Sequence, residues 1–318
     1  MLIPVLLFLL GFVLLIKGGD WFVDGAVAMA HRFHLPELLI GATIVSIGTT
    51  LPEVMVSTQA AIQGNAGISY GNAIGSIICN TALIAALTVA VSPGPVDKKS
   101  LTFPVAAFFT AAVLYSGFSY TTGKLTRING VVFLLMFVVY MVLTVIQMRS
   151  ADDAEAEDSG ETRLWQELAL LIVGAAAIAV GANLLVNNGT VIAQTLGVPD
   201  SVIGLTAVAL GTSLPELITA ITSLMKGHGA LSLGNVIGAN LFNIVLVSGM
   251  AITISPFSIP AEKLIGGMNA SLVVDIPVML GVMAILCIPA LIRGKLSRWQ
   301  GILLLCIYAA FTAFQFFA

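Results

Sequence analysis

The sequence predicts an all-α polytopic membrane protein: ten transmembrane helices in two inverted-topology five-helix repeats, with helices 2, 3, 7 and 8 broken. Of its 318 residues, 58% are hydrophobic and 9% are charged, against about 25% charged residues in an ordinary soluble domain. A water-soluble globule would lack the polar residues to cover its surface. The composition also excludes a disordered chain and argues against a nucleic-acid-binding protein, which would carry a clustered basic face.

Ten stretches have the length and apolarity of a membrane span, which needs about 20 mostly apolar residues. They divide the chain into a first repeat at 1–148, an acidic linker at 149–165 and a second repeat at 166–318. The predicted spans are 1–17, 37–62, 70–91, 102–119, 129–148, 166–187, 201–225, 232–255, 270–293 and 298–317.

The basic residues predict the orientation in the membrane. The loops after spans 1, 3, 5, 7 and 9 hold ten Lys and Arg residues, and the opposite side holds three: Lys124, Arg127 and Lys263. The positive-inside rule therefore places the odd-numbered loops and the acidic linker in the cytoplasm, with both termini outside. We expect a multi-pass protein of the cell membrane. His31, His34 and His228 are expected to be solvated in cytoplasmic loops.

One segment occurs twice. Residues 41–80 align with 204–243 at a constant offset of 163 without gaps, and 15 of the 40 positions are identical. Five spans separate the two copies. Because five is odd, the second copy enters the membrane in the opposite orientation. Inverted repeats of this kind build secondary transporters, whose site lies at the repeat interface near the bilayer midplane.

Two acidic residues lie deep within apolar runs, and the repeat relates them. They are Glu53 and Glu216, each about midway along its span. A charged side chain at the centre of a bilayer costs about 2.5–3.5 kcal/mol on insertion scales. The presence of this cost at two related positions indicates a functional site rather than a structural one.

The residues before each glutamate predict a broken helix. GTTLPE at 48–53 matches GTSLPE at 211–216. Pro52 and Pro215 cannot donate to the helix ladder, and each ring clashes with the carbonyl four residues back, where a glycine stands. We expect freed carbonyls and the neighbouring hydroxyls of Thr49, Thr50, Thr212 and Ser213 to point toward the carboxylates.

A second element in each half adds amide groups. Asn72, Ser76 and Asn80 are four residues apart and share one helix face, and Asn235, Ala239 and Asn243 repeat the pattern without the hydroxyl. The adjacent glycines also suit close helix packing, but a buried amide must find partners. Both repeats thus offer oxygen ligands with no histidine or thiolate, which favours Ca²⁺ or Na⁺.

These motifs carry a family resemblance. GTTLPE with GTSLPE, and GNAIGSIICN with GNVIGANLFN, resemble the two alpha repeats of the sodium/calcium exchanger family within the calcium/cation antiporter superfamily, of the prokaryotic type. The resemblance implies an antiporter that exchanges Ca²⁺ for Na⁺ by alternating access. It also implies that the first and sixth spans slide across the core.

The resemblance further implies roles for individual residues. Glu53 and Glu216 would be central Ca²⁺ carboxylates shared with Na⁺. The other implied ligands are the carbonyls of Thr49 and Thr212 for Ca²⁺; Ser46, Thr49, Ser76, Thr212 and the Ala209 carbonyl for flanking Na⁺ ions; Thr50 and Ser213 as supports; and Asn80 and Asn243 beside the cavity.

Two features depart from the family pattern. Family members usually read Gly-Ser-Asn before the last polar residue, whereas this chain has Ser76-Ile77 and Ala239-Asn240. Ala239 lacks a hydroxyl that would help to hold Na⁺, so the Na⁺ stoichiometry stays open. Some members carry Asp at the position of Asn80 or Asn243, and its absence argues against K⁺ co-transport.

The sequence leaves three other functions to consider. A proton-coupled cation exchanger on the same fold is the main alternative, because burial favours a protonated carboxylate. An intramembrane enzyme gives no role to the repeated prolines and hydroxyls, and a channel fits poorly with midplane sites on broken helices. We therefore expect a transporter without a cofactor, whose partners are its substrates Ca²⁺ and Na⁺ and the lipid bilayer, with no nucleic acid and no obligate protein partner.

Overall fold

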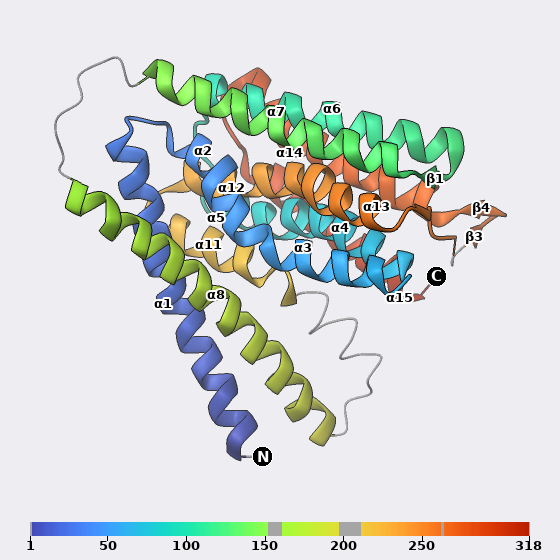
Figure 1. Cartoon of the computed structure of the whole chain (residues 1–318), viewed down its shortest axis with the longest axis horizontal. Coiled ribbons are helices and arrows are strands. Elements are labelled where there is room, and N and C mark those ends of the chain that lie inside the picture. The colour runs from blue at the N-terminus through green and yellow to red at the C-terminus, as the bar shows by residue number, and fades with distance from the viewer. Residues whose placement is uncertain (1, 152–160, 197–210, 262–263, 318) are drawn as a thin grey trace.

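The computed structural model describes residues 2–151, 161–196, 211–261 and 264–317 (Figure 1). Eight helical segments in these ranges have the length and composition of membrane spans. The first half runs through α1 (Leu2–Arg32), α2 (Glu37–Ile40), η1 (Gly41–Val45), α3 (Ser46–Ile62), α4 (Ala66–Cys79), η2 (Asn80–Ala85), α5 (Ala86–Val91), α6 (Lys98–Thr122) and α7 (Arg127–Ala151).

The second half repeats some of these boundaries. Its elements are α8 (Glu161–Thr195), α11 (Leu214–Met225), α12 (Gly229–Phe242), η4 (Asn243–Ser248), α13 (Gly249–Ile254), η5 (Ser271–Asp275), α14 (Ile276–Arg293) and α15 (Arg298–Phe317). The bounds of α12, η4 and α13 each lie 163 residues after those of α4, η2 and α5. The sequence repeat is therefore also a repeat of secondary structure.

The helix is not broken where the sequence predicted a break. Pro52 lies inside α3, which continues from Ser46 to Ile62. The irregularity comes earlier, in the π-helical turn η1, whose wider i→i+5 ladder replaces the ordinary one. Spans 3 and 8 likewise continue through η2 and η4 instead of breaking. The prediction of broken helices 2, 3 and 8 was wrong in this respect: the backbone absorbs the irregularity as π-helix.

In the second half, Thr212 and Ser213 form a turn directly before α11, and Pro215 stands in the first turn of that helix. Proline is favoured there because an N–H in the first turn has no partner in the helix. The remainder of the predicted break and residue Ala209 lie outside the described residues. Most of the predicted linker, residues 152–160, also lies outside them, although α7 and α8 extend into its two ends.

Helices α1 and α8 form an antiparallel pair that projects from the main body (Figure 1). Both are longer than predicted, since α1 runs to Arg32 and α8 begins at Glu161. Glycines let their backbones approach: a Cβ added at Gly11 would lie 2.8 Å from the Gly181 carbonyl, and one at Gly18 would lie 3.0 Å from that of Gly174. The repeat relates Gly11 to Gly174 and Gly18 to Gly181, so the pairing has two-fold pseudosymmetry.

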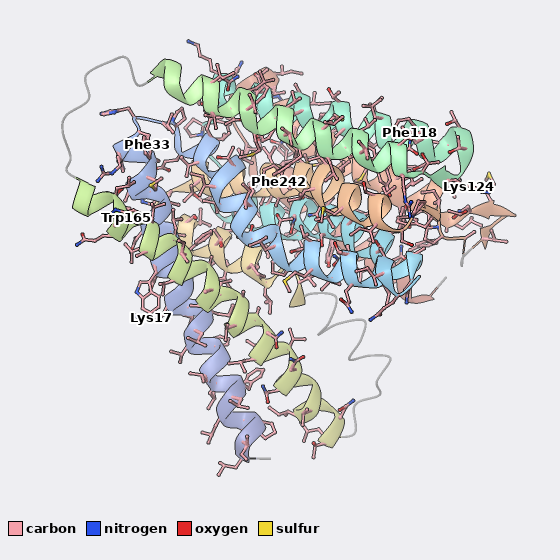
Figure 2. The ribbon with its side chains drawn as sticks, in the orientation of Figure 1. Lys17, Phe33, Phe118, Lys124, Trp165 and Phe242 are labelled. Atoms are coloured by element: carbon pink, nitrogen blue, oxygen red, sulfur yellow. The ribbon has the colours of Figure 1, made fainter. Side chains whose placement is uncertain are left out.

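The main body is an apolar core formed by the remaining helices. Phe242 lies fully buried in the middle of it, whereas Trp165 on the projecting pair is 72% exposed (Figure 2). Phe137 and Tyr140 of α7 pack edge-on against Phe242. Two short antiparallel pairings lie at one end of the body: β1 (Lys124–Leu125) pairs with β2 (Phe257–Ser258), and β3 (Leu264–Ile265) pairs with β4 (Met268–Asn269).

Asp97 caps α6 and yields a pH-dependent prediction. Its side chain accepts hydrogen bonds from the backbone N–H groups of Lys99 and Ser100 and from the Ser100 hydroxyl. The Ser100 hydroxyl, with these N–H groups, lowers the pKa of Asp97. A carboxyl whose pKa is lowered by folding stabilises the folded state above its ordinary pKa and loses this contribution as pH falls through the folded value.

We therefore expect Asp97→Ala to lower stability by about 1 kcal/mol at neutral pH, the usual effect of losing a cap. The difference from wild type should shrink as the pH falls below about 4, where the carboxylate becomes protonated. Thermal unfolding in detergent at a series of pH values measures this. Asp97→Asn, which keeps one acceptor, is the control and should lose less; a pH-independent difference would refute the capping role.

Candidate functional site

The two repeated glutamates meet inside the main body. Glu53 lies in α3 directly after Pro52, and Glu216 lies in the first turn of α11 directly after Pro215. Both side chains are 0% exposed. Pro52 and Pro215, which directly precede them, line one small cavity, so the fold brings together the only pair of acids predicted to lie at membrane depth.

The carboxylate oxygens of Glu53 and Glu216 have no hydrogen-bond partner within the described part of the chain. The hydroxyls of Ser76 and Thr49 lie beside Glu53 and Glu216, without hydrogen bonds of ordinary geometry. The other unsatisfied buried atoms of this region are Thr50 Oγ1, Ser213 Oγ, both side-chain polar atoms of Asn80, Asn235 Nδ2, Asn240 Oδ1 and Asn243 Oδ1.

Each unsatisfied buried polar atom costs roughly 1–3 kcal/mol, more for a charged group. Native interiors hold few such atoms, and a set that includes two carboxylates is typical of a site that binds a ligand or ordered water. A cation would satisfy the carboxylate, hydroxyl and amide oxygens together. The chemistry of the donors therefore fits a hard cation bound through oxygen.

Cross-repeat hydrogen bonds hold the walls of the site. The Thr49 hydroxyl donates to Asn235 Oδ1 at 3.2 Å, and the Thr212 hydroxyl donates to Asn72 Oδ1 at 3.4 Å. The repeat offset of 163 relates these two contacts to each other. Each half thus uses its asparagine to orient the threonine of the other half, with Asn235 buried and Asn72 half-buried.

The asparagine and serine neighbours extend this network. Asn72 Nδ2 donates to the Glu53 carbonyl at 3.2 Å and to the Ser57 hydroxyl at 2.9 Å, which fixes the backbone at the carboxylate. Ser46 donates to the Gly41 carbonyl at 2.7 Å and to the Asn235 carbonyl at 2.9 Å. The Ser46 hydroxyl is therefore engaged with the backbone of η1 and α12 rather than directed only toward an ion.

The last asparagine of the repeated segment in each half begins a π-helical turn. Asn80 is the first residue of η2 and Asn243 the first of η4. Asn243 Nδ2 donates to the Ala239 carbonyl at 3.0 Å, which leaves Oδ1 as the unsatisfied atom. π-bulges occur frequently at functional sites. Here they stand at the two residues predicted to lie beside the central cavity.

Two features were missed from the sequence. Asn240 donates to the Thr81 hydroxyl at 2.7 Å and to the Met283 sulfur at 3.2 Å, and its own oxygen stays unsatisfied. An amide inside an apolar span was the available signal for it. Phe22 of α1 also covers the site: it borders a cavity of about 10 Å³ with Gly48, Thr49, Pro52, Ala175, Ile178, Ala179 and Pro215.

The projecting pair thus packs on the wall that bears both prolines. A Cβ added at Gly48 would lie 3.0 Å from the Phe22 ring, so a larger residue here would require the ring to shift. His228 departs from the prediction of a solvated loop residue, because its Nδ1 lies 2.8 Å from Glu37 Oε1. In the described residues, no group of three or more His, Cys, Asp or Glu side chains is arranged for a metal ion.

Comparison with known proteins gives a consistent result. The model of the family described as sodium/calcium exchanger protein matches residues 3–146 and 167–317. The chain is 39% identical to the membrane protein MJ0091 of Methanocaldococcus jannaschii, over 95% of this chain and 94% of that protein. It is 32% identical to the sodium/calcium exchanger MaX1 of Methanosarcina acetivorans, over 98% of each chain.

A solved structure agrees over nearly the whole length. The sodium-calcium exchanger NCX_Mj, soaked with Na⁺ and without Ca²⁺, superposes with a TM-score of 0.82 at 35% identity, covering 98% of this chain and 99% of that one. The family match, the relatives and the shared fold agree with the motifs found in both halves. The chain belongs to the sodium/calcium exchanger family.

Proposed function

We propose that this protein is a secondary antiporter that exchanges Ca²⁺ for Na⁺ by alternating access. The observation that carries the proposal is the pair Glu53 and Glu216: repeat-related, fully buried, mutually close and without hydrogen-bond partners among the described residues. One Ca²⁺ balances both charges. Several Na⁺ ions cannot share the same carboxylates with Ca²⁺, so one substrate displaces the other.

The remaining ligands follow from the packing around the pair. We assign the carbonyls of Thr49 and Thr212 to Ca²⁺, because the cross-repeat bonds to Asn235 and Asn72 fix these residues beside the carboxylates. Thr50, Ser213, Asn80 and Asn243 supply oxygens that lack other partners. Flanking Na⁺ sites take Ser76 in one half, with Ser46, Thr49, Thr212 and the carbonyl of Ala209 as further ligands.

The proposal includes a topology. Ten spans form two inverted halves, 1–148 and 166–318, in the cell membrane, with both termini outside and the linker in the cytoplasm. It is supported by the distribution of Lys and Arg and by the 163-residue offset in helix boundaries. The glycine-lined pair α1 and α8 moves as one body over the proline-bearing wall, which opens the site to one side at a time.

The direct test is Ca²⁺ uptake into proteoliposomes loaded with Na⁺. Choline-loaded vesicles, K⁺-loaded vesicles and vesicles with an imposed pH gradient are the controls. We expect uptake only with internal Na⁺, and we expect it to increase when the vesicle interior is held positive, because more than two Na⁺ leaving per Ca²⁺ moves net positive charge outward. Each elementary charge moved through 100 mV is worth about 2.3 kcal/mol. Uptake driven by the pH gradient alone would instead support proton coupling at the same carboxylates.

Ser76 gives a test of Na⁺ binding in the first half. Its hydroxyl lies beside Glu53, and the repeat-related residue Ala239 has none. We expect Ser76→Ala to reduce the apparent Na⁺ affinity about fivefold, corresponding to about 1 kcal/mol for one lost oxygen contact. Ca²⁺ uptake as a function of internal Na⁺ measures this.

The matched control is Ser116→Ala in α6. The Ser116 hydroxyl donates to the Ala112 carbonyl one helical turn back. Its loss should leave the Na⁺ dependence unchanged. An equal effect of both substitutions would remove Ser76 from the Na⁺ site.

A further inference from the structure

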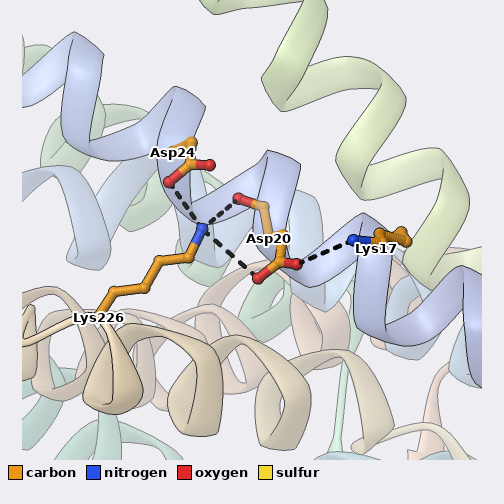
Figure 3. Close-up of polar contacts among 4 residues, drawn as sticks. All are labelled: Lys17, Asp20, Asp24 and Lys226. Carbon is orange, nitrogen blue, oxygen red and sulfur yellow. Dashed lines mark hydrogen bonds and ion pairs between the residues drawn. The ribbon is translucent and has the colours of Figure 1, made fainter.

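A charged contact joins α1 to the C-terminal end of α11. Lys226 caps α11, and its Nζ lies 2.7 Å from Asp24 Oδ1 and 3.5 Å from Asp20 Oδ1 (Figure 3). It also donates to the Asp20 carbonyl at 3.1 Å. Lys17 Nζ lies 4.0 Å from the other oxygen of Asp20. One ammonium thus spans two carboxylates and a carbonyl on consecutive turns of α1.

The contact lies where α1 packs against α11 of the main body. A Cβ added at Gly19 would lie 2.7 Å from Ile218 and 2.9 Å from the Thr222 hydroxyl, both in α11. The Lys226 side chain is 28% exposed, so its charge interactions are partly shielded from water. Exposed ion pairs contribute little singly, but a cation shared by two carboxylates forms a small network.

A second ion pair has a different location. Arg32 Nε lies 2.7 Å from Glu167 Oε2, with both side chains 12% exposed. Arg32 belongs to α1 and Glu167 to α8, so this pair lies within the projecting body. The two ion pairs therefore differ in one respect: Lys226 joins α1 to the main body, whereas Arg32 joins α1 to α8.

The repeat supplies a neutral counterpart of the Lys226 contact. An offset of 163 carries Asp20 to Asn183, Asp24 to Asn187 and Lys226 back to Gln63. Asn187 donates to Asn183 at 2.6 Å, and no hydrogen bond joins either of them to the Gln63 side chain in the part of the chain that the structure describes. The charged contact is formed, and its amide counterpart is not.

We infer that Lys226 with Asp20 and Asp24 is a latch that closes the cytoplasmic side, and that Gln63 with Asn183 and Asn187 is the corresponding latch of the opposite state. This inference rests on the proposed alternating-access exchange. Movement of α1 and α8 as one body breaks the Lys226 contact, brings the amides to Gln63 and leaves Arg32–Glu167 intact. Because one latch is ionic and the other is neutral, the resting equilibrium favours the cytoplasm-closed state.

Cross-linking tests whether the latch must open. In a Cys306→Ser background, which removes the exposed native cysteine, Asp24→Cys with Lys226→Cys is joined by a short reducible thiosulfonate cross-linker. We expect cross-linking to reduce Na⁺-driven Ca²⁺ uptake at least tenfold and reduction to restore it, which also shows that the variant is folded. Arg32→Cys with Glu167→Cys is the matched control and should keep at least half of its uptake when cross-linked. Unchanged uptake in the cross-linked 24–226 variant would overturn the latch.

Labelling tests the bias between states without relying on transport. Thr222→Cys, which faces Gly19 beneath α1, is exposed to an impermeant maleimide from the Lys226 side. We expect Lys226→Gln to raise the labelling rate about fivefold, and a transplanted latch, Gln63→Lys with Asn183→Asp and Asn187→Asp, to raise it in the same direction. Equal rates in all three proteins would overturn the inference. Loss of the proposed exchange would appear separately, as absent uptake in the uncross-linked parent.

Discussion

Glu53→Gln and Glu216→Gln should each reduce Na⁺-driven Ca²⁺ uptake by about 100-fold or more. Removing one charged partner from a buried ionic contact costs roughly 3–5 kcal/mol, and every 1.4 kcal/mol corresponds to a factor of ten. Both carboxylates are 0% exposed, so solvent does not compensate for the loss of the negative charge. The measurement is initial uptake rate at several Ca²⁺ concentrations, for each variant reconstituted at equal density.

The same variants should unfold at an unchanged or higher temperature. Each substitution removes a buried charge that faces a like charge and has no hydrogen-bond partner among the described residues. Activity and stability are therefore expected to move in different directions, as they do at a site built for a ligand. Glu37→Gln, at a part-buried carboxylate paired with His228, is the control and should keep uptake within about twofold. Loss of uptake together with loss of stability would indicate structural glutamates instead.

Gly234→Ala should produce the largest loss of stability. A Cβ at this position would collide with the carbonyl of Leu38, which is backbone and cannot swing aside. Overpacking a tight contact costs typically 1–3 kcal/mol, and a backbone collision belongs at the upper end. We expect a lower unfolding temperature in detergent and a lower yield of monodisperse protein, because α12 and α2 can no longer approach each other.

Gly117→Ala provides the matched control for this substitution. Gly117 lies inside the last two turns of α6, and no described atom outside its own helical backbone lies within 4 Å of an added Cβ. Alanine is favoured over glycine in a helix interior by about 1 kcal/mol, so stability should be unchanged or slightly raised. If Gly234→Ala and Gly117→Ala behave alike, the close approach of α12 to α2 is not what stabilises the core.

Much of the site could be predicted because the repeat doubles each signal. A lone intramembrane glutamate or proline is ambiguous, but the coincidence of Glu53 with Glu216 predicts a shared site. In the structure both acids are buried, and the prolines that precede them line one cavity. The boundaries of α12, η4 and α13 follow the same 163-residue offset. Apolar length alone was sufficient to locate most spans, since a membrane helix needs no amphipathic period.

The sequence was less informative about backbone detail. Pro52 reads as a helix breaker, yet α3 continues through it and the irregularity appears in η1. A π-helical turn has no composition of its own, so Asn80 and Asn243 gave no sign that they begin one. The length of α1 was underestimated because Lys17, Asp20 and Asp24 interrupt the apolar run, although these charges lie on a helix that continues to Arg32.

Contacts between the two repeats could also not be predicted from residue types alone. Asn72 and Asn235 stood out as amides within apolar spans, but their partners, Thr212 and Thr49, come from the opposite half. Sequence spacing shows which residues share a helix face, and it does not show which faces meet. The pairing of Lys226 with Asp20 and Asp24 depends in the same way on how α1 packs against α11.

The central claim is that Ca²⁺ and Na⁺ compete for one site formed by Glu53 and Glu216. Equilibrium binding of radioactive Ca²⁺ to the purified protein, titrated with Na⁺ at constant ionic strength in choline, tests it most directly. We predict one Ca²⁺ per chain, displaced by Na⁺ with a Hill coefficient above one, and no binding to the variant with both glutamates replaced by Gln. Ca²⁺ binding that is indifferent to Na⁺, or that persists in the double variant, would contradict the claim.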